Sequence, residues 1–272
     1  MTRMEQALQE RQPILKQEEA NPPAISISHL SFCYPDCTHA IYDLNLQVQP
    51  GERVGIVGAN GCGKTTFFLL LCGILTPTAG EISILGKPVI PGAFETRVGL
   101  VFQNPDDQLF SASVWEDVAF GPRNLGLPPD EVEQRVNTAM TLTNVVDLAQ
   151  RPPHHLSGGQ KKRVAIAGVL ATNPEILLLD EPSAQLDPRS RRQLIRLLDS
   201  LPQTQLIATH DLDLALELCD RTILFSEGRI ICDGDTYAIL GNAELLEQYA
   251  LELPLSYSRP YCQLNHAPDM NR

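Results

Sequence analysis

The sequence predicts an α/β fold in which a mostly parallel β-sheet follows an antiparallel β segment, and three observations support this prediction. Apolar runs of strand length alternate with helical patterns from about residue 53 to residue 225, which is typical of parallel sheets. Before that, residues 24–28 and 44–48 alternate apolar and polar side chains, as strands with one buried face do. Of the 272 residues, 43% are hydrophobic, enough for one large α/β unit with small appendages.

The first part of the chain contains a polar tail, the alternating strands and one helix. Residues 1–23 are polar, end in Asn-Pro-Pro and are expected to form a flexible N-terminal tail. After the alternating strands, a Pro-Gly turn at residues 50 and 51 precedes a third apolar run at 53–57. A helical pattern then covers residues 64–74 and is stopped by Pro77.

Strands and helices alternate through the rest of the chain. Further strand-like apolar runs lie at residues 81–85, 98–102, 176–179, 205–209 and 222–225. Mostly helical patterns, interrupted by prolines, fill residues 105–163. A basic helix is predicted at 189–198 and an amphipathic helix at 243–253, and the proline-containing end is expected to lack regular structure.

Charge and composition exclude several classes of function. Lys and Arg number 21 against 33 Asp and Glu, and the resulting net charge of −12 disfavours binding to nucleic acid, which needs basic residues to neutralise phosphates. The longest dense apolar stretch, residues 67–75, is far shorter than the roughly 20 residues of a membrane-spanning helix. The N-terminus lacks the pattern of a secretory signal, and seven scattered cysteines favour a reducing compartment. We therefore expect an intracellular protein that serves a membrane, if at all, as a peripheral subunit.

A glycine-rich turn at residues 58–65 matches the phosphate-loop pattern G-x-x-x-x-G-K-[ST]. It follows an apolar run and opens a helix, so that curled backbone N–H groups and the helix N-terminus can bind phosphate oxygens. Lys64 would neutralise the terminal phosphates, and the Thr65 hydroxyl would ligate Mg²⁺. The predicted phosphate-binding residues are Asn60, Gly61, Cys62, Gly63, Lys64, Thr65 and Thr66.

Two carboxylates end the most apolar strand of the chain. The run at 176–179 is followed directly by Asp180 and Glu181, at the end of a parallel strand where ligands bind. Asp180 would hold Mg²⁺, because oxygen ligands suit a hard cation. Glu181 would orient and deprotonate the attacking water. Ordinary solvated acids at a strand end are the alternative, which the nearby phosphate loop makes less favoured.

Between these two segments, the pentapeptide Leu-Ser-Gly-Gly-Gln at 156–160 resembles the signature of the ATP-binding-cassette (ABC) ATPases. The other family elements match in order: Tyr34 is placed like the aromatic that stacks on adenine, Gln103 like the Q-loop glutamine, and His210 like the switch histidine. Residues 183–187 resemble the D-loop, which ends in Asp187.

The resemblance covers about residues 24–235 and implies a fold and a mechanism. The implied fold is a P-loop NTPase cassette with a mixed β-sheet core, an antiparallel β subdomain, an inserted helical subdomain at about 104–165, and a C-terminal extension at 236–272. The implied mechanism uses ATP, Mg²⁺ and a head-to-tail dimer of two cassettes, formed either by two copies of this chain or by this chain and a related cassette. Gln103 would lie beside the metal and the water, and His210 would sense the γ-phosphate. Residues of the second cassette would complete the ATP site with Ser157, Gly158, Gly159, Gln160 and Asp187.

A narrower match lies in the helical segment. Residues 102–110 and 116–126 closely resemble the ATPase subunits of energy-coupling-factor importers, the branch that includes cobalt, nickel and biotin uptake. That resemblance implies a transmembrane coupling protein, a membrane-embedded substrate-binding protein, and a place on the cytoplasmic face of the cell membrane. Asp106 and Asp107 would either receive basic residues of the coupling protein or only cap their helix.

Two positions depart from the family pattern. Cys62 lies inside the phosphate loop, and its thiol is either activated by Lys64 and the helix N-terminus or, as we favour, a tolerated small side chain. Gln185 stands where many relatives have glycine, so this position is expected to offer no special backbone freedom.

Three functions are compatible with the cassette. A transport ATPase is favoured; an ABC ATPase that works on nucleic acid or ribosomes lacks support from the charge and from the single cassette. A regulatory module that hydrolyses nothing is disfavoured by the joint presence of Glu181 and His210. The transported substrate is chosen by membrane proteins outside this chain.

Overall fold

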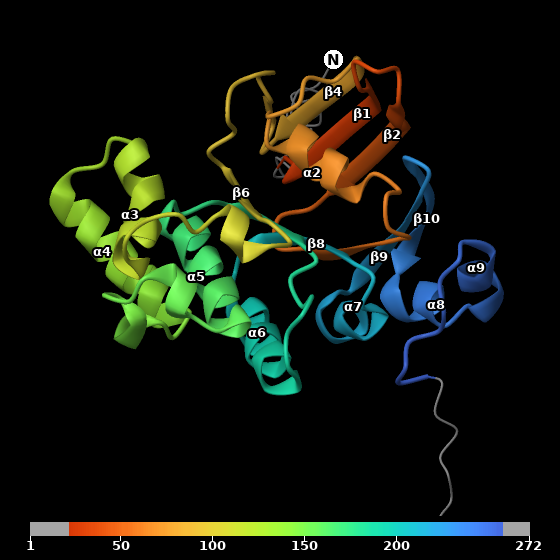
Figure 1. Cartoon of the computed structure of the whole chain (residues 1–272). Coiled ribbons are helices and arrows are strands. Elements are labelled where there is room, and N and C mark those ends of the chain that lie inside the picture. The colour runs from red at the N-terminus through yellow and green to blue at the C-terminus, as the bar shows by residue number, and fades with distance from the viewer. Residues whose placement is uncertain (1–21, 258–272) are drawn as a thin grey trace, which may run out of the picture.

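The computed structural model describes residues 22–257, and Figure 1 shows their arrangement. An antiparallel sheet lies over one end of a larger sheet, and helices flank both sides of the larger one. The antiparallel sheet has the order β2-β1-β4-β5. Its strands are β1 (Ile25–Cys33), β2 (His39–Val48), β4 (Ala79–Ile84) and β5 (Lys87–Pro88). The predicted antiparallel segment is confirmed, and it also recruits residues that follow the first helix.

The larger sheet has six strands in the order β10-β9-β3-β8-β7-β6. The strands are β3 (Arg53–Val57), β6 (Val98–Val101), β7 (Ile176–Asp180), β8 (Thr204–Thr209), β9 (Arg221–Ser226) and β10 (Arg229–Asp235). All neighbours pair in parallel except β10, which pairs antiparallel with β9. All five residues of β7 are buried, because helices cover both faces of a parallel sheet. The predicted mixed sheet is therefore confirmed.

Most helices share a hydrophobic core on one face of the larger sheet, whereas the first helix packs with the antiparallel sheet on the other face (Figure 1). Beside β6 lie α3 (Val114–Asn124), α4 (Pro129–Leu142) and α5 (Gly158–Ala171), which share a hydrophobic core with the sheet. The remaining helices are α2 (Lys64–Leu71), α6 (Pro188–Ser200), α7 (Leu212–Leu218), α8 (Thr236–Leu240) and α9 (Ala243–Gln248). The predicted helical subdomain corresponds to α3–α5, and its expected end at residue 165 falls inside α5. No helix in residues 22–257 is long and apolar enough to cross a membrane.

Arg97 ties the two sheets together at the start of β6. Its guanidinium donates to the carbonyl oxygen of Ile84 in β4 at 2.6 Å, and its own carbonyl accepts from the backbone of Glu175 and Ile176 ahead of β7. An ion pair with Glu95 orients the same guanidinium, and the hydrogen bonds from Arg97 lower the pKa of the Glu95 carboxyl. The two sheets are thus held together by polar contacts as well as by a shared hydrophobic core.

The C-terminal part differs from its prediction. The amphipathic helix expected over 243–253 ends at Gln248, and Ala250 has a φ of +56°, which no α-helix accommodates. Leu251 and Leu253 nevertheless pack on the same hydrophobic cluster as Leu246. The hydrophobic periodicity thus identified the buried face, although half of the segment is not helical. The expectations for residues 1–21 and for the last proline-containing stretch from residue 258 lie outside the described residues.

Candidate functional site

A cavity of about 830 Å³ opens at the carboxyl ends of the parallel strands. The phosphate loop follows β3, Asp180 ends β7 and Gln103 follows β6, so neighbouring strands deliver the site. The predicted residues that line this cavity are Tyr34, Asn60, Gly61, Cys62, Gly63, Lys64, Thr65, Thr66, Gln103, Asp180 and Glu181. The structure therefore brings together residues that the sequence spreads over about 150 positions.

The phosphate loop needs glycine at two positions for different reasons. Gly63 has a φ of +111°, a conformation that side chains rarely adopt, immediately before α2 begins. At Gly58, a Cβ atom would lie 2.1 Å from the carbonyl oxygen of Phe225 in β9. The loop therefore curls around the N-terminus of α2, where free backbone N–H groups can bind phosphate oxygens.

Lys64 and Cys62 lie together inside this loop. The Lys64 ammonium donates to the carbonyl oxygens of Gly58 at 2.7 Å and Ala59 at 3.1 Å, which keeps the charge beside the loop. The Cys62 sulfur lies 3.9 Å from the Lys64 nitrogen. Burial raises the pKa of the Cys62 thiol and outweighs the opposing effect of Lys64. The structure therefore supports a tolerated small side chain at position 62 rather than an activated thiol.

The two predicted Mg²⁺ ligands are in contact. The Thr65 hydroxyl donates to Asp180 Oδ2 at 2.7 Å, and Asp180 is 4% exposed. Burial raises the pKa of Asp180, the Glu181 carboxylate adds to this effect, and the hydrogen bond from Thr65 opposes it. Mg²⁺ prefers oxygen donors such as these hydroxyl and carboxylate groups. A bound cation would in turn stabilise the negative charge of the buried Asp180 carboxylate. These residues fit the ion that the sequence predicted.

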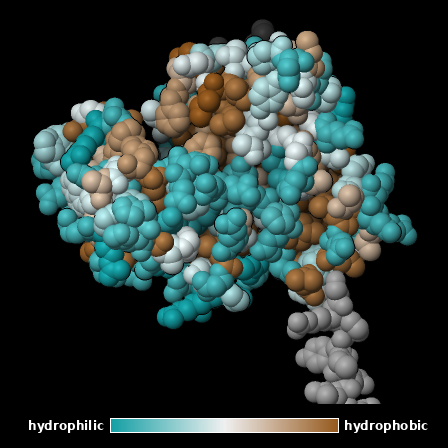
Figure 2. Space-filling model, in the orientation of Figure 1, coloured by the Kyte–Doolittle hydropathy of each residue, from teal (hydrophilic) through white to brown (hydrophobic). Residues whose placement is uncertain are grey.

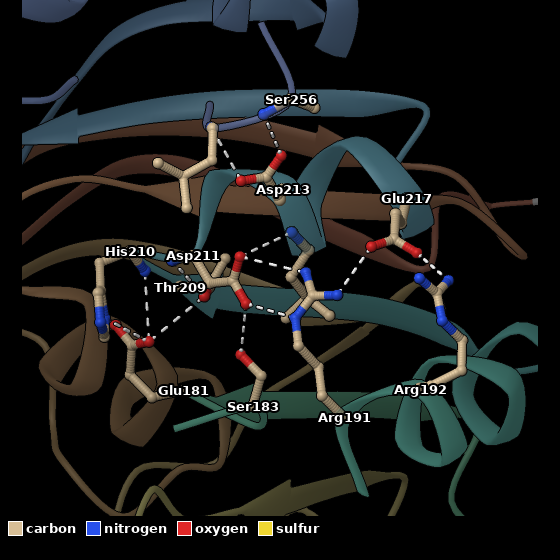
Figure 3. Close-up of polar contacts among 12 residues, drawn as sticks. Glu181, Ser183, Arg191, Arg192, Thr209, His210, Asp211, Asp213, Glu217 and Ser256 are labelled. Carbon is tan, nitrogen blue, oxygen red and sulfur yellow. Dashed lines mark hydrogen bonds and ion pairs between the residues drawn. The ribbon is translucent and has the colours of Figure 1, made fainter. Parts of the chain in front are cut away.

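Glu181 and His210 form the second functional pair (Figure 3). His210 Nδ1 lies 2.8 Å from Glu181 Oε2, and the same oxygen accepts from the His210 backbone N–H and the Thr209 hydroxyl, both at 3.3 Å. Glu181 Oε1 is buried and has no hydrogen-bond partner among the described residues. One carboxylate oxygen is therefore held by His210 and Thr209, while the other has no partner among the described residues.

Tyr34 also lines the cavity, together with residues that the sequence did not indicate. Its hydroxyl is 2.9 Å from the Thr66 hydroxyl, so the ring is held beside the first turn of α2. His39 and Tyr42 stack with ring centroids 5.3 Å apart, and the Arg229 guanidinium lies 4.7 Å from the Tyr42 centroid. The contact of Arg229 with Tyr42 could not be found from the sequence, because it joins β2 to the distant strand β10.

Lys162 is another side chain close to the site that the sequence did not indicate. It is 2% exposed on α5, and its ammonium donates to the backbone oxygens of Gln103 at 2.7 Å and Phe102 at 3.1 Å. Lys162 therefore links α5, which begins at the signature pentapeptide, to the backbone around Gln103. Desolvation lowers the pKa of Lys162 to about 8, although Asp180 and Glu181 oppose this effect.

The signature residues and Asp187 do not line the cavity. Ser157 caps α5 through a capping box with Gln160, and Asp187 caps α6 by accepting from the backbone N–H groups of Arg189 and Ser190. A Cβ on Gly158 would meet open space, whereas one on Gly159 would lie 2.5 Å from the Ser190 hydroxyl. Within one subunit, these residues are therefore separate from the phosphate loop.

The comparisons with known proteins agree with this geometry. The sequence profile of the ABC transporter family matches residues 41–184. A putative ABC transporter ATP-binding protein of Synechocystis is 53% identical over 235 residues, covering 86% of this chain and 83% of the relative. The energy-coupling factor transporter ATP-binding protein EcfA of Methanothermobacter thermautotrophicus is 48% identical, covering 85% and 76%. The structure of cbiO1 from Clostridium perfringens, described as part of the ABC transporter complex cbiONQ, matches with 41% identity and a TM-score of 0.74, covering 84% of this chain and 94% of cbiO1. The chain therefore belongs to the ATP-binding proteins of ABC transporters.

Proposed function

We propose that this ABC transporter ATPase is the ATP-hydrolysing subunit of an energy-coupling-factor importer, and that it powers uptake of a micronutrient such as cobalt, nickel or a vitamin. The relatives named EcfA and cbiO1 support this assignment, as does the resemblance of residues 102–110 and 116–126 to that branch. The proposed location is the cytoplasmic face of the membrane, beside a transmembrane coupling protein and a membrane-embedded substrate-binding protein.

One observation supports a dimer of cassettes. The cavity is lined by the phosphate loop, Gln103, Asp180 and Glu181, while the signature turn at 157–160 and Asp187 are absent from its described lining. A second copy that offers its signature turn across this opening would add the exposed N-terminus of α5 to the phosphate site. ATP would then bridge two subunits, and its hydrolysis would remove the charge that holds them together.

The chemistry of hydrolysis follows from the side chains. Thr65 and Asp180 would hold Mg²⁺, with Gln103 nearby, and the ion would supply positive charge against the phosphates. Lys64 binds the terminal phosphates, and Tyr34 stacks on adenine. Glu181 Oε1 accepts a proton from the attacking water, while His210 holds the other carboxylate oxygen and contacts the γ-phosphate.

An exposed apolar surface beside the helices α3 and α5 supports the proposal of a membrane partner. A cavity of about 590 Å³ lies between β6, the segment that precedes it, and the helices α3 and α5, and Figure 2 shows hydrophobic surface in this region. Its exposed apolar side chains are Ile74, Phe94, Phe110, Phe120 and Leu125. Exposed apolar surface of this extent marks an interaction site, and a cytoplasmic helix of the coupling protein is the proposed occupant.

The expected charge contacts at this surface need revision. The Asp106 carboxylate accepts from Lys161 at 2.7 Å, and Asp107 accepts from the Asn104 side chain at 3.2 Å. Asn104 also caps the short helix that contains both acids. The acids thus bond within the subunit and Asn104 provides the cap in their place, so the docking proposal rests on the apolar residues instead.

Replacement of Glu181 by Gln tests the central assignment. The amide keeps the size of the carboxylate but cannot accept a proton, so ATP turnover is expected to fall by at least about 100-fold. ATP binding and ATP-dependent dimer formation are expected to persist, measured by equilibrium binding and size-exclusion chromatography. Turnover near the wild-type rate would show that Glu181 is not the base.

The transport assignment has its own test. Co-purification of the chain with a multispan membrane protein, followed by reconstitution in vesicles, is expected to give ATP-dependent uptake of cobalt, nickel or a vitamin. The Glu181→Gln variant in the same vesicles is the control for leakage. Efflux, or assembly with a different class of membrane protein, would contradict the importer assignment.

A further inference from the structure

Arg191 on α6 connects α7 to the rest of the catalytic domain at both ends of that short helix (Figure 3). Its Nε donates to Asp211 Oδ2 at 2.9 Å and its Nη2 to Asp211 Oδ1 at 3.3 Å. Its Nη1 donates to Glu217 Oε1 at 2.8 Å. Asp211 precedes α7 and Glu217 lies in its last turn, so one guanidinium fixes the helix at two points.

Asp211 is where this ion pair meets the catalytic residues. It directly follows His210, and its Oδ2 also accepts from the Ser183 hydroxyl at 3.1 Å, two residues after Glu181. The Asp211 backbone N–H donates to the Thr209 hydroxyl at 3.0 Å, and that hydroxyl donates to Glu181 Oε2. Asp211 therefore contacts both segments that hold the proposed base, one through its carboxylate and the other through its backbone N–H.

The hydrogen-bond partners of Asp211 keep its carboxyl group ionised. Burial by itself would raise the pKa of this carboxyl, but the hydrogen bonds from Arg191, the Leu214 backbone and Ser183 hold it below its ordinary value. Without Arg191, a half-buried carboxylate would lose its cation. Movement of Asp211 toward solvent would then displace the start of α7 and the contact with Ser183.

We propose that Arg191 is a positioning residue for ATP hydrolysis. By holding Asp211 and Glu217, it fixes α7 relative to α6, so that His210 and the segment after Glu181 keep the base in place. Arg191 is absent from the described lining of the ATP cavity and acts only through these contacts. The inference rests on the proposed role of Glu181.

The neighbouring arginine supplies a matched control. Arg192 lies on the same helix, carries the same charge and pairs with Glu217 Oε2. Its described contacts do not include Asp211. Substitution of Arg192 therefore removes an ion pair between α6 and α7 while the link to Asp211 remains.

The test compares Arg191→Gln, Arg192→Gln and Ser183→Ala in the full-length protein, isolated with its co-purifying partners. For Arg191→Gln, we expect kcat for ATP to fall at least about tenfold with KM changed by less than about twofold. For Arg192→Gln, both constants are expected to stay within about twofold of the wild type. Ser183→Ala, which removes another bond to the same carboxylate, is expected to lower kcat at least about threefold. Melting temperatures are measured in parallel.

Equal effects of Arg191→Gln and Arg192→Gln on kcat would overturn the inference, as would a loss of kcat explained fully by a smaller folded fraction. If Arg191→Gln does not fold, Ser183→Ala decides, and an unchanged kcat in that variant overturns the proposal. Glu181→Gln is measured alongside. Wild-type turnover by Glu181→Gln would refute the proposed base. If Glu181→Gln is inactive but Arg191→Gln and Arg192→Gln have the same kcat, only the role of Arg191 is refuted.

Discussion

The proposed base and a residue near it have backbone conformations that non-glycine residues rarely adopt. Glu181 has a φ of +45° and Gln185 a φ of +62°, so strain lies in the segment that carries the chemistry. The backbone N–H of Glu181 donates to Ala208 in β8 at 2.8 Å, which helps to hold its conformation. Gln185 is exposed and adopts a conformation that glycine takes more easily. The sequence shows that position 185 carries glutamine in place of glycine, but the strained backbone conformation of Gln185 could not be predicted from it.

Replacement of Gln185 by Gly is expected to stabilise the protein. Relief of the left-handed strain exceeds the entropy that glycine adds to the unfolded state, giving a net gain of up to about 1 kcal/mol. The exposed Gln134 on α4 is the matched control, because Gln134→Gly in a helix interior should cost about 1 kcal/mol. Urea unfolding of both variants measures the difference, and equal destabilisation by the two substitutions would contradict the prediction.

The Cys62 thiol is expected to be unreactive at neutral pH. Burial raises its pKa, and the thiolate is the reactive form, whereas Cys37 is exposed. Alkylation by iodoacetamide at pH 7.5, followed by mass spectrometry of the peptides, should modify Cys62 at least about tenfold more slowly than Cys37. If Cys62 reacts as fast as Cys37, Lys64 activates the thiol despite its burial.

At the scale of elements, α5 shows what sequence patterns can and cannot predict. Its start follows from local chemistry, because Ser157 and Gln160 have the spacing of a capping box. The burial of Lys162 does not follow, since three consecutive basic residues at 161–163 are typical of a solvent-exposed helix surface. Lys162 is buried only because β6 ends next to α5 and leaves two carbonyl groups for its ammonium. Contacts of this kind depend on tertiary packing.

Lys162 should make stability depend on alkaline pH. Desolvation lowers its pKa to about 8 in the folded state from an ordinary value of 10.5, so the unfolded state binds more protons between these two values. The unfolding free energy of the wild type should therefore rise from pH 8 to pH 10.5 relative to that of Lys162→Met, by up to about 3 kcal/mol. Chemical denaturation of both proteins across this range, in EDTA, measures the difference. A constant difference would show that Lys162 keeps an ordinary pKa.

At the scale of the whole molecule, the sequence predicts the residues of the site better than the contacts between them. The phosphate loop is contiguous, and Asp180 and Glu181 are adjacent, so their chemistry is visible in the sequence itself. The link from Arg191 through Asp211 to Ser183 crosses three segments, and only the packing of α6 against α7 brings them together. The same holds for the contact of Arg229 in β10 with the Tyr42 ring in β2.

The division of the site between subunits predicts complementation between inactive variants. Lys64→Ala removes the phosphate-loop charge, and Ser157→Arg blocks the signature turn. When the two differently tagged variants are co-expressed, a heterodimer contains one doubly altered site and one intact site. If each site works independently, the randomly paired mixture should show about a quarter of wild-type ATP turnover, and the purified heterodimers about half. Co-expression of Lys64→Ala with Glu181→Gln is the control, because both changes lie on the same side of the interface and leave no intact site. Equal turnover in the two mixtures, after tandem-tag purification of the heterodimers, would contradict a head-to-tail arrangement.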